Sequence, residues 1–136
     1  MIQKLKLIDF PERYNDAWCL MHVDCESELR DIAQHSGNVA KLRANFRTRM
    51  NYLRENWENA VLHHEWFEKL SHDKDLYSLH IASVNNLRIL YVLRGDQAWL
   101  LCCFAEKSSG KRDSYERYIP VARKRLSELL EVENNV

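Results

Sequence analysis

The chain has 136 residues, which suits one compact domain and is short for two domains of ordinary size. Hydrophobic residues make up 46% and charged residues 29%, a composition typical of folded globular proteins and not of disordered chains. Lysine and arginine total 20, as do aspartate and glutamate, so the formal net charge is zero. A chain without net charge has no bulk attraction for nucleic acid or an anionic membrane, and an anionic partner requires a local basic patch.

The four cysteines lack the Cys-x-x-Cys spacing of a metal or redox site; they are Cys19, Cys25, Cys102 and Cys103. No signal peptide is recognisable, and no apolar run approaches the roughly 20 residues that span a bilayer. We therefore expect a cytoplasmic protein with reduced thiols and no membrane partner. The adjacent Cys102 and Cys103 are expected to face opposite sides of a strand.

The N-terminal region, residues 1–24, is expected to contain strands. Charged and apolar residues alternate from Lys4 to Phe10, and less regularly from Trp18 to Val23, which predicts two short strands. A helical hairpin is predicted over 25–57. Asp24 is placed to cap its first helix, which we expect to run from about Cys25 to His35.

The segment Ser36-Gly37-Asn38 supplies a helix stop, a turn and a new N-cap. The second helix is predicted from apolar residues at spacings of three and four: Val39, Leu42, Phe46, Met50, Leu53 and Trp57. Five basic residues fall mostly off this stripe: Lys41, Arg43, Arg47, Arg49 and Arg54.

A sheet meander is predicted over 76–107. Short segments rich in strand-forming residues run over 76–82, 87–94 and 98–105. Turns are expected at Asn85-Asn86 and Gly95-Asp96. If Gly95-Asp96 is a two-residue turn, Val92 pairs with Trp99 and Arg88 with Cys103.

A C-terminal helix is predicted over 115–131, with Pro120 tolerated only near its first turn. The expected order is one or two strands, two helices, three strands and a helix, all in a single domain, 1–136. Because the helices are grouped and do not alternate with strands, this order indicates an α+β fold in which an antiparallel meander packs on the helical pair.

Strand parity predicts a group of chemically active side chains on one sheet face. Residues two apart share a face, so His80 lies with Arg88 if the intervening loop has an odd number of residues. Extending the parity places Lys107 on this face and Glu106 on the other. The alternative for Arg88 is an ordinary solvated strand residue whose stem covers neighbouring apolar side chains.

An imidazole and two cations on one face can bind a phosphate, stabilise the charge of a phosphoryl transition state and move a proton near neutral pH. Such a site cleaves RNA without a metal. Basic residues also exceed acidic ones by four between positions 105 and 126. The candidates for RNA-backbone contact in this segment are Lys111, Arg112, Arg117, Arg123 and Lys124. The alternative is a solvated helix surface.

The histidines do not indicate a metal site. His63, His64 and His72 lie near Glu65, but the spacing is not His-Glu-x-x-His, so core or surface histidines are favoured. With only 3 glycines, the chain has no Gly-rich phosphate loop. We expect neither a metal nor a cofactor.

Four segments in order, from about Trp66 to Leu126, resemble the RelE/HigB superfamily, the toxins of bacterial type II toxin-antitoxin systems, and in particular its phage-derived branch. The segments are Phe67-Glu-Lys-Leu70, Leu76-Tyr-Ser-Leu-His-Ile81, Leu87-Arg-Ile-Leu-Tyr91 and Phe104-Ala-Glu-Lys107, followed by a basic terminal helix. Residues 1–65 match only in outline, and the N-terminal stretch is longer than the minimal form of the family.

The resemblance implies a RelE-like α+β domain whose sheet is flanked by helices, acting as a ribosome-dependent endoribonuclease on translated mRNA. It implies a cognate antitoxin, often a helix-turn-helix protein, in a heterotetramer or beside a toxin homodimer. Arg88 matches the strand arginine of the family, Lys107 falls at the basic position that closes the last strand, and His80 lies where many members carry Arg or Lys. Less definite matches to the C-terminal basic and aromatic positions are Lys111 or Arg112, and Tyr115 or Tyr118.

In the implied mechanism, His80 or a lysine assists the ribose 2′-hydroxyl, Arg88 and Lys107 stabilise the developing charge, and a tyrosine orients the base. Two residues depart from the active pattern: Ser78 stands where some members are basic, and Glu106 adds a negative charge. Two other functions remain open. A ParE-type relative poisons DNA gyrase by protein contact, and a non-enzymatic binding module of phage or plasmid origin needs no active face.

Overall fold

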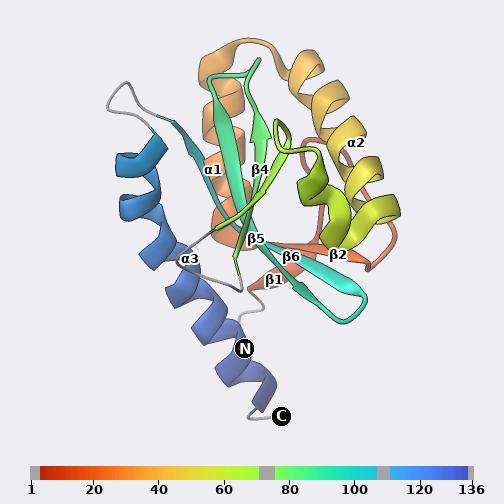
Figure 1. Ribbon diagram of the computed structural model, residues 1–136, viewed down its shortest axis with the longest axis vertical. Coiled ribbons are helices and arrows are strands. Elements are labelled where there is room, and N and C mark those ends of the chain that lie inside the picture. The colour runs from red at the N-terminus through yellow and green to blue at the C-terminus, as the bar shows by residue number, and fades with distance from the viewer. Residues whose placement is uncertain (1–3, 71–75, 107–110, 135–136) are drawn as a thin grey trace.

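The computed structural model describes residues 4–70, 76–106 and 111–134, and in the last segment the side chains of 114–131. Within these ranges, one six-stranded sheet carries helices on both faces (Figure 1). The strands are β1 Leu5–Leu7, β2 Cys19–His22, β3 Phe67–Lys69, β4 Tyr77–Ile81, β5 Leu87–Arg94 and β6 Gln97–Ala105. The helices are α1 Val23–Ser36, α2 Val39–Asn56, the short 3-10 helix η1 Trp57–Leu62 and α3 Lys111–Asn134.

The α+β class is confirmed, but the sheet is mixed and not wholly antiparallel as predicted. Its order is β1-β2-β6-β5-β4-β3, and every described pairing is antiparallel except β2 with β6. The hairpin of α1 and α2 carries the chain from β2 back across the sheet, and such long crossovers are the connections that place strands parallel. Strand parity within 76–107 gave no information on this long-range pairing.

The meander of β4, β5 and β6 agrees with the prediction. Gly95, with φ of 59°, and Asp96 form the turn between β5 and β6, and Val92 pairs with Trp99 as expected. Strand β3 was not predicted, because three residues are too few to show a period of two. This short strand extends the sheet beyond β4.

A β-bulge changes the predicted register of β6. Tyr91 lies opposite Leu100 but Leu90 lies opposite Cys102, so β6 contains one extra residue at this point. Arg88 therefore pairs with Phe104, and the predicted pairing with Cys103 is wrong. Because a one-residue shift exchanges the two faces of a strand, the side chain of Glu106 joins the face of Arg88.

The helical hairpin forms largely as predicted, with a different first cap. His22 Nδ1 accepts a hydrogen bond of 3.0 Å from the backbone N–H of Asp24, so His22 and not Asp24 is the N-cap of α1. Gly37 ends α1 in the left-handed conformation with φ of 69°, and Asn38 Oδ1 accepts from the Lys41 N–H to cap α2.

Helix α3 begins earlier than predicted and contains Pro120 in its interior, more than two turns from Lys111. The expectation that this proline stands near the first turn is therefore wrong. Tyr115, Ala122 and Leu129 are buried against the sheet, and this burial offsets the hydrogen bond that the proline cannot donate. No helix in the described part of the chain is both long and apolar enough to cross a membrane.

Two hydrophobic cores lie on opposite faces of the sheet. One is under α1 and α2 and includes Leu79, Ile89 and Cys103, whereas the other is under α3 and includes Leu90 and Cys102. The two adjacent cysteines thus face opposite sides, as predicted. All four cysteines are unpaired and buried, and burial raises the pKa of each thiol.

His22 lies fully buried where β2 meets α1. Burial lowers the pKa of its imidazole, and the nearby positive charge of Arg125 lowers it further, while Asp24 and Glu128 oppose the shift. The folded protein therefore holds this imidazole neutral at a pH at which the unfolded chain begins to take up a proton.

We expect the free energy of unfolding to decrease as the pH falls through 6.5, the ordinary value for histidine, because below it the unfolded state binds more protons than the folded state. His22→Asn keeps an N-cap acceptor but does not titrate, so its stability should change less between pH 7.5 and 5.5. Urea unfolding of both proteins at the two pH values measures the difference. Equal losses in the two proteins would show that His22 is not the group responsible.

Candidate functional site

His80 and Arg88 lie directly opposite each other on β4 and β5. The turn at Asn85 and Asn86, both with positive φ, sets this register. Both side chains face the α3 side of the sheet, because Leu79 and Ile89 beside them belong to the core on the other side. The structure thus places together two of the residues that the sequence proposed as catalytic.

Arg88 is buried and its guanidinium lies among three oxygen-bearing side chains. Its Nε donates to Glu106 Oε2 at 2.8 Å, its Nη1 donates to Tyr115 Oη at 3.0 Å, and its Nη1 is 4.0 Å from Glu68 Oε1. The residue is 7% exposed, which excludes the solvated strand arginine considered as the alternative. Burial of this cation is tolerated because the two carboxylates neutralise it.

Tyr115 connects α3 to this group, which we call the Arg88 network: Glu68, Arg88, Glu106 and Tyr115. Its hydroxyl donates to Glu68 Oε1 at 2.9 Å while accepting from Arg88. Burial raises the pKa of Tyr115, although the Ser78 hydroxyl and the charge of Arg88 act in the opposite direction. The phenol therefore stays protonated and holds the guanidinium in place.

Two members of the network were not expected from the sequence. Glu106 was assigned to the opposite face, and the bulge brings it to Arg88. Glu68 comes from β3, where it pairs with Ser78 of β4. A carboxylate in a three-residue strand gives no periodic signal, so only the fold identifies Glu68 as a partner of Arg88.

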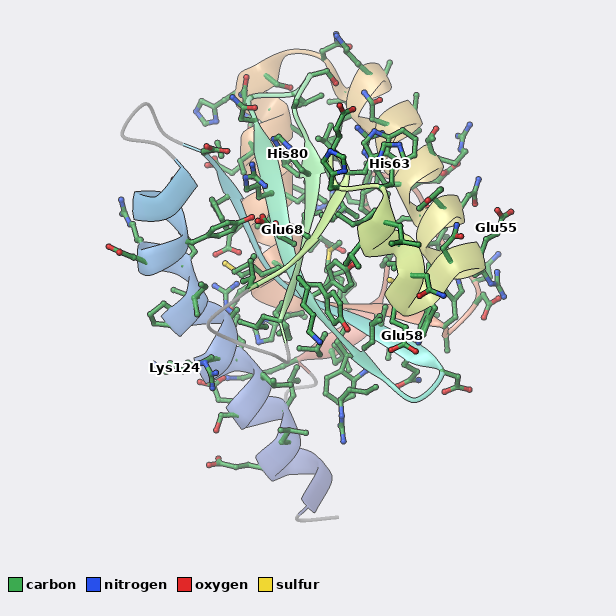
Figure 2. The ribbon with its side chains drawn as sticks, viewed as in Figure 1. Glu55, Glu58, His63, Glu68, His80 and Lys124 are labelled. Carbon is green, nitrogen blue, oxygen red and sulfur yellow. The ribbon has the colours of Figure 1, made fainter. Side chains whose placement is uncertain are left out.

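One nitrogen of the Arg88 guanidinium has no acceptor among the described residues. Its Nη2 makes no hydrogen bond there, although the residue is only 7% exposed. His80 is half-buried, and its Nε2 lies 3.3 Å from Asn86 Oδ1. Figure 2 shows His80 and Glu68 over the sheet, and Lys124 on α3.

His80 has a lowered pKa. Burial is the main cause, the charge of Arg88 adds to it, and the hydrogen bond with Asn86 and the charge of Glu106 oppose it. The imidazole is therefore neutral near pH 7 and can accept a proton. An arginine donor beside a neutral imidazole is an arrangement that can bind a phosphate and deprotonate a hydroxyl.

Residues on the α1 and α2 side of the sheet hold the backbone of β4 at His80. The His80 N–H donates to Trp66 O at 2.8 Å, and Arg49 Nε donates to His80 O at 3.1 Å. Arg49 also lies 4.1 Å from the centre of the Trp66 ring, on which His63 stacks at 3.9 Å and against which Tyr52 packs edge-on at 5.6 Å. His63 thus belongs to an aromatic cluster. The described residues contain no group of three or more His, Cys, Asp or Glu arranged to hold a metal ion.

The remaining predicted residues are only partly placed. Lys107, and the side chains of Lys111 and Arg112, lie outside the described residues. Tyr118 stacks on Phe104, with parallel rings 4.4 Å apart, and does not belong to the Arg88 network. Tyr115 is the one of the two tyrosines that reaches the predicted site.

The described surface of α3 is not strongly basic. Arg125 points inward and pairs with Glu28 of α1. The outward basic side chains between 114 and 131 are Arg117, Arg123 and Lys124, and the acidic ones are Glu116, Glu128 and Glu131. Over 114–131 the outward charges therefore balance, and the basic excess counted to position 126 does not extend along the whole helix.

Three comparisons with known proteins gave no match: no family model, no curated protein and no solved structure is significantly similar to this chain.

Proposed function

We propose that this protein is the toxin of a type II toxin-antitoxin pair of the RelE/HigB kind, a metal-independent endoribonuclease that cuts translated mRNA on the ribosome. The observation that carries the proposal is the pairing of His80 with Arg88 on one sheet face. The first can accept a proton and the second can hold a phosphate, and Arg88 is the residue that matches the strand arginine of the family. A cognate antitoxin and the ribosome are the partners that this function requires.

In the proposed reaction the neutral imidazole of His80 takes the proton of a ribose 2′-hydroxyl. The 2′-oxygen then forms a bond to the adjacent phosphorus, and the bond from phosphorus to the 5′-oxygen breaks. The leaving oxygen takes a proton from water, and the resulting hydroxide takes the proton from His80, which returns to its neutral form. The products are a 2′,3′-cyclic phosphate and a 5′-hydroxyl. Arg88 stabilises the charge that develops on the phosphoryl oxygens, and Tyr115 positions Arg88 through its hydroxyl.

The two carboxylates of the network oppose the binding of a phosphate. A phosphate that binds Arg88 competes with Glu106 and Glu68 for the same guanidinium. The available Nη2 gives the phosphate a first contact, and the ribosome supplies the positioning that free mRNA lacks. Weak cleavage of free RNA and stronger cleavage during translation are therefore expected together.

The test is primer extension on a reporter mRNA with and without translating ribosomes. We expect cleavage that requires translation and that slows on the acid side of pH 6.5, since His80 must be neutral and its pKa is lowered. His80→Gln should cleave about 100-fold more slowly and lose this acid limb. An intact message in the presence of folded protein and active ribosomes would rule the proposal out.

A non-enzymatic binding module is the second candidate, and the burial of Arg88 favours it. An arginine neutralised by two carboxylates and covered by Tyr115 of α3 also serves as a purely structural tie between helix and sheet. Intact mRNA without a growth defect would favour this candidate. DNA damage without mRNA cleavage would instead indicate a ParE-type gyrase poison.

A further inference from the structure

A cavity of about 560 Å³ lies at the opposite end of β5 from Arg88. The loop before β2, the end of α2 and the turn between β5 and β6 together line it, through Asp16, Ala17, Trp18, Arg54, Trp57, Gly95, Asp96 and Gln97. Six residues of extended strand separate Arg88 from Arg94, about 20 Å, so this cavity is separate from the Arg88 network. Its volume is within the range of small-molecule sites.

One indole and one carboxylate of the lining already hold a cationic side chain of the protein, Arg54. The Arg54 guanidinium lies 5.4 Å from the centre of the Trp18 ring and pairs with the carboxylate of Asp16. The backbone N–H of Trp18 also donates to Asp16 Oδ1 at 3.3 Å. An indole face and a carboxylate thus hold one guanidinium, which is the usual chemistry of cation recognition by aromatic residues.

The lining also contains a second indole and a second carboxylate. Trp57 and Asp96 line the cavity, and among the described residues no cation lies over the Trp57 ring and none forms an ion pair with Asp96. The Trp57 ring is 6.2 Å from the Trp18 ring at an interplanar angle of 56°, so the two indoles form adjoining walls. With two carboxylates and one guanidinium, the lining favours cations over phosphates.

The backbone at Trp57 is strained. The sequence pattern places Trp57 on the apolar stripe of α2, but the helix ends at Asn56 because Trp57 adopts φ of 52° and ψ of −122°. A bulky residue at positive φ is uncommon, and such strain concentrates at binding sites. Trp57 still packs against the core under α1 and α2, and it also lines the cavity.

We propose that this cavity binds an organic cation, a quaternary ammonium or a guanidinium group, over Trp57 with Asp96 as its counter-charge. The site differs in ligand and location from the Arg88 network, so the proposal does not depend on nuclease activity. Both a small cation and an arginine side chain of a peptide have the required chemistry.

The test follows the indole N–H signals of the four tryptophans by NMR during titration with choline and, separately, with Gly-Arg-Gly amide. We expect a saturable shift of the Trp57 signal with a dissociation constant on the order of 1 mM. Tighter binding of choline would indicate a small organic cation as the ligand, and tighter binding of the peptide would indicate an arginine side chain. Asp96→Asn should weaken binding at least fivefold, whereas Asp31→Asn, an exposed carboxylate on α1, should not.

The neutral isostere of choline, 3,3-dimethyl-1-butanol, and equal sodium chloride are the controls. Binding of the alcohol as tightly as choline would overturn the proposal, because it would show an apolar site. An unchanged affinity in Asp96→Asn, or no saturable shift of Trp57 with either cation, would overturn it as well. Because Asp96 lies in an exposed turn, its conversion to Asn leaves the fold intact, which the remaining signals verify.

Discussion

Arg88→Ala should abolish mRNA cleavage while Glu106→Gln preserves it, although both variants disrupt the same ion pair. Arg88 Nε and Glu106 Oε2 are 2.8 Å apart, so either change weakens one shared interaction. Loss of Arg88 removes the donor that we propose for the phosphate, and cleavage should fall about 100-fold or more. Loss of the Glu106 charge leaves a guanidinium that is less neutralised and more available to RNA, so cleavage should equal or exceed that of the wild type.

Stability separates this result from simple unfolding. Arg88→Ala leaves two carboxylates and the Tyr115 hydroxyl without their buried partner, which we expect to cost about 3 kcal/mol. Glu106→Gln keeps an oxygen for Arg88 Nε and should cost about 1 kcal/mol. Urea unfolding measures both costs, and primer extension is then run where each variant is folded. If folded Arg88→Ala still cleaves, or if Glu106→Gln is equally inactive, Arg88 is not the phosphate-binding group.

The elements with strong local signals were predictable. The apolar stripe of α2 appears as buried Leu42, Phe46, Met50 and Leu53, because a period near 3.6 is a property of the helix alone. The Gly37 stop and the Gly95 turn were also predictable, since each needs a positive φ that glycine adopts readily. Arg49 belongs to the same helix and was placed off the stripe, yet it is buried. Its guanidinium lies over the Trp66 ring and donates to a backbone carbonyl of β4.

The predictions that were wrong or missing concern contacts between distant segments. The bulge in β6 has no marker in the strand sequence, and it reversed the assignment of Glu106. Parity placed His80 with Arg88 correctly because their strands are joined by a short turn. Strand parity could not place Glu68, because β3 comes from a separate segment of the chain. The sequence therefore predicted the pairing of His80 with Arg88, but it did not predict the partners of Arg88 that come from other elements.

The end of the β2–β6 pairing explains an ion pair that joins α1, α3 and β6. Strand β2 pairs with β6 only as far as Leu100, so the following backbone groups of β6 need other partners. Glu28 of α1 accepts from the Cys103 N–H at 3.1 Å, and Arg125 of α3 donates to Leu101 O at 2.9 Å. The two side chains join each other through two bonds of 2.8 Å. Burial alone would lower the pKa of Arg125, but Glu28 raises it above its ordinary value.

Glu28→Ala should therefore destabilise the protein by about 3 to 5 kcal/mol, because it leaves a half-buried guanidinium and a backbone N–H without their acceptor. This is a large share of the free energy that stabilises a domain of this size. Glu28→Gln keeps an acceptor for Cys103 and should lose less. Urea unfolding of the variants, followed by tryptophan fluorescence, measures these losses.

Glu12 and Arg47 provide the matched control, since they also form a two-bond pair, with Nη2–Oε1 and Nε–Oε2 distances of 2.6 and 2.9 Å. The Arg47 side chain is 54% exposed and that of Arg125 only 14%. Water screens the exposed pair, so Glu12→Ala should cost less than about 1 kcal/mol. If the two alanine variants lose equal stability, the pair on β6 is an ordinary surface ion pair. If only Glu28→Ala is severely destabilised, the bulge, α1 and α3 are held together by this one carboxylate, and the helix that covers Arg88 depends on it.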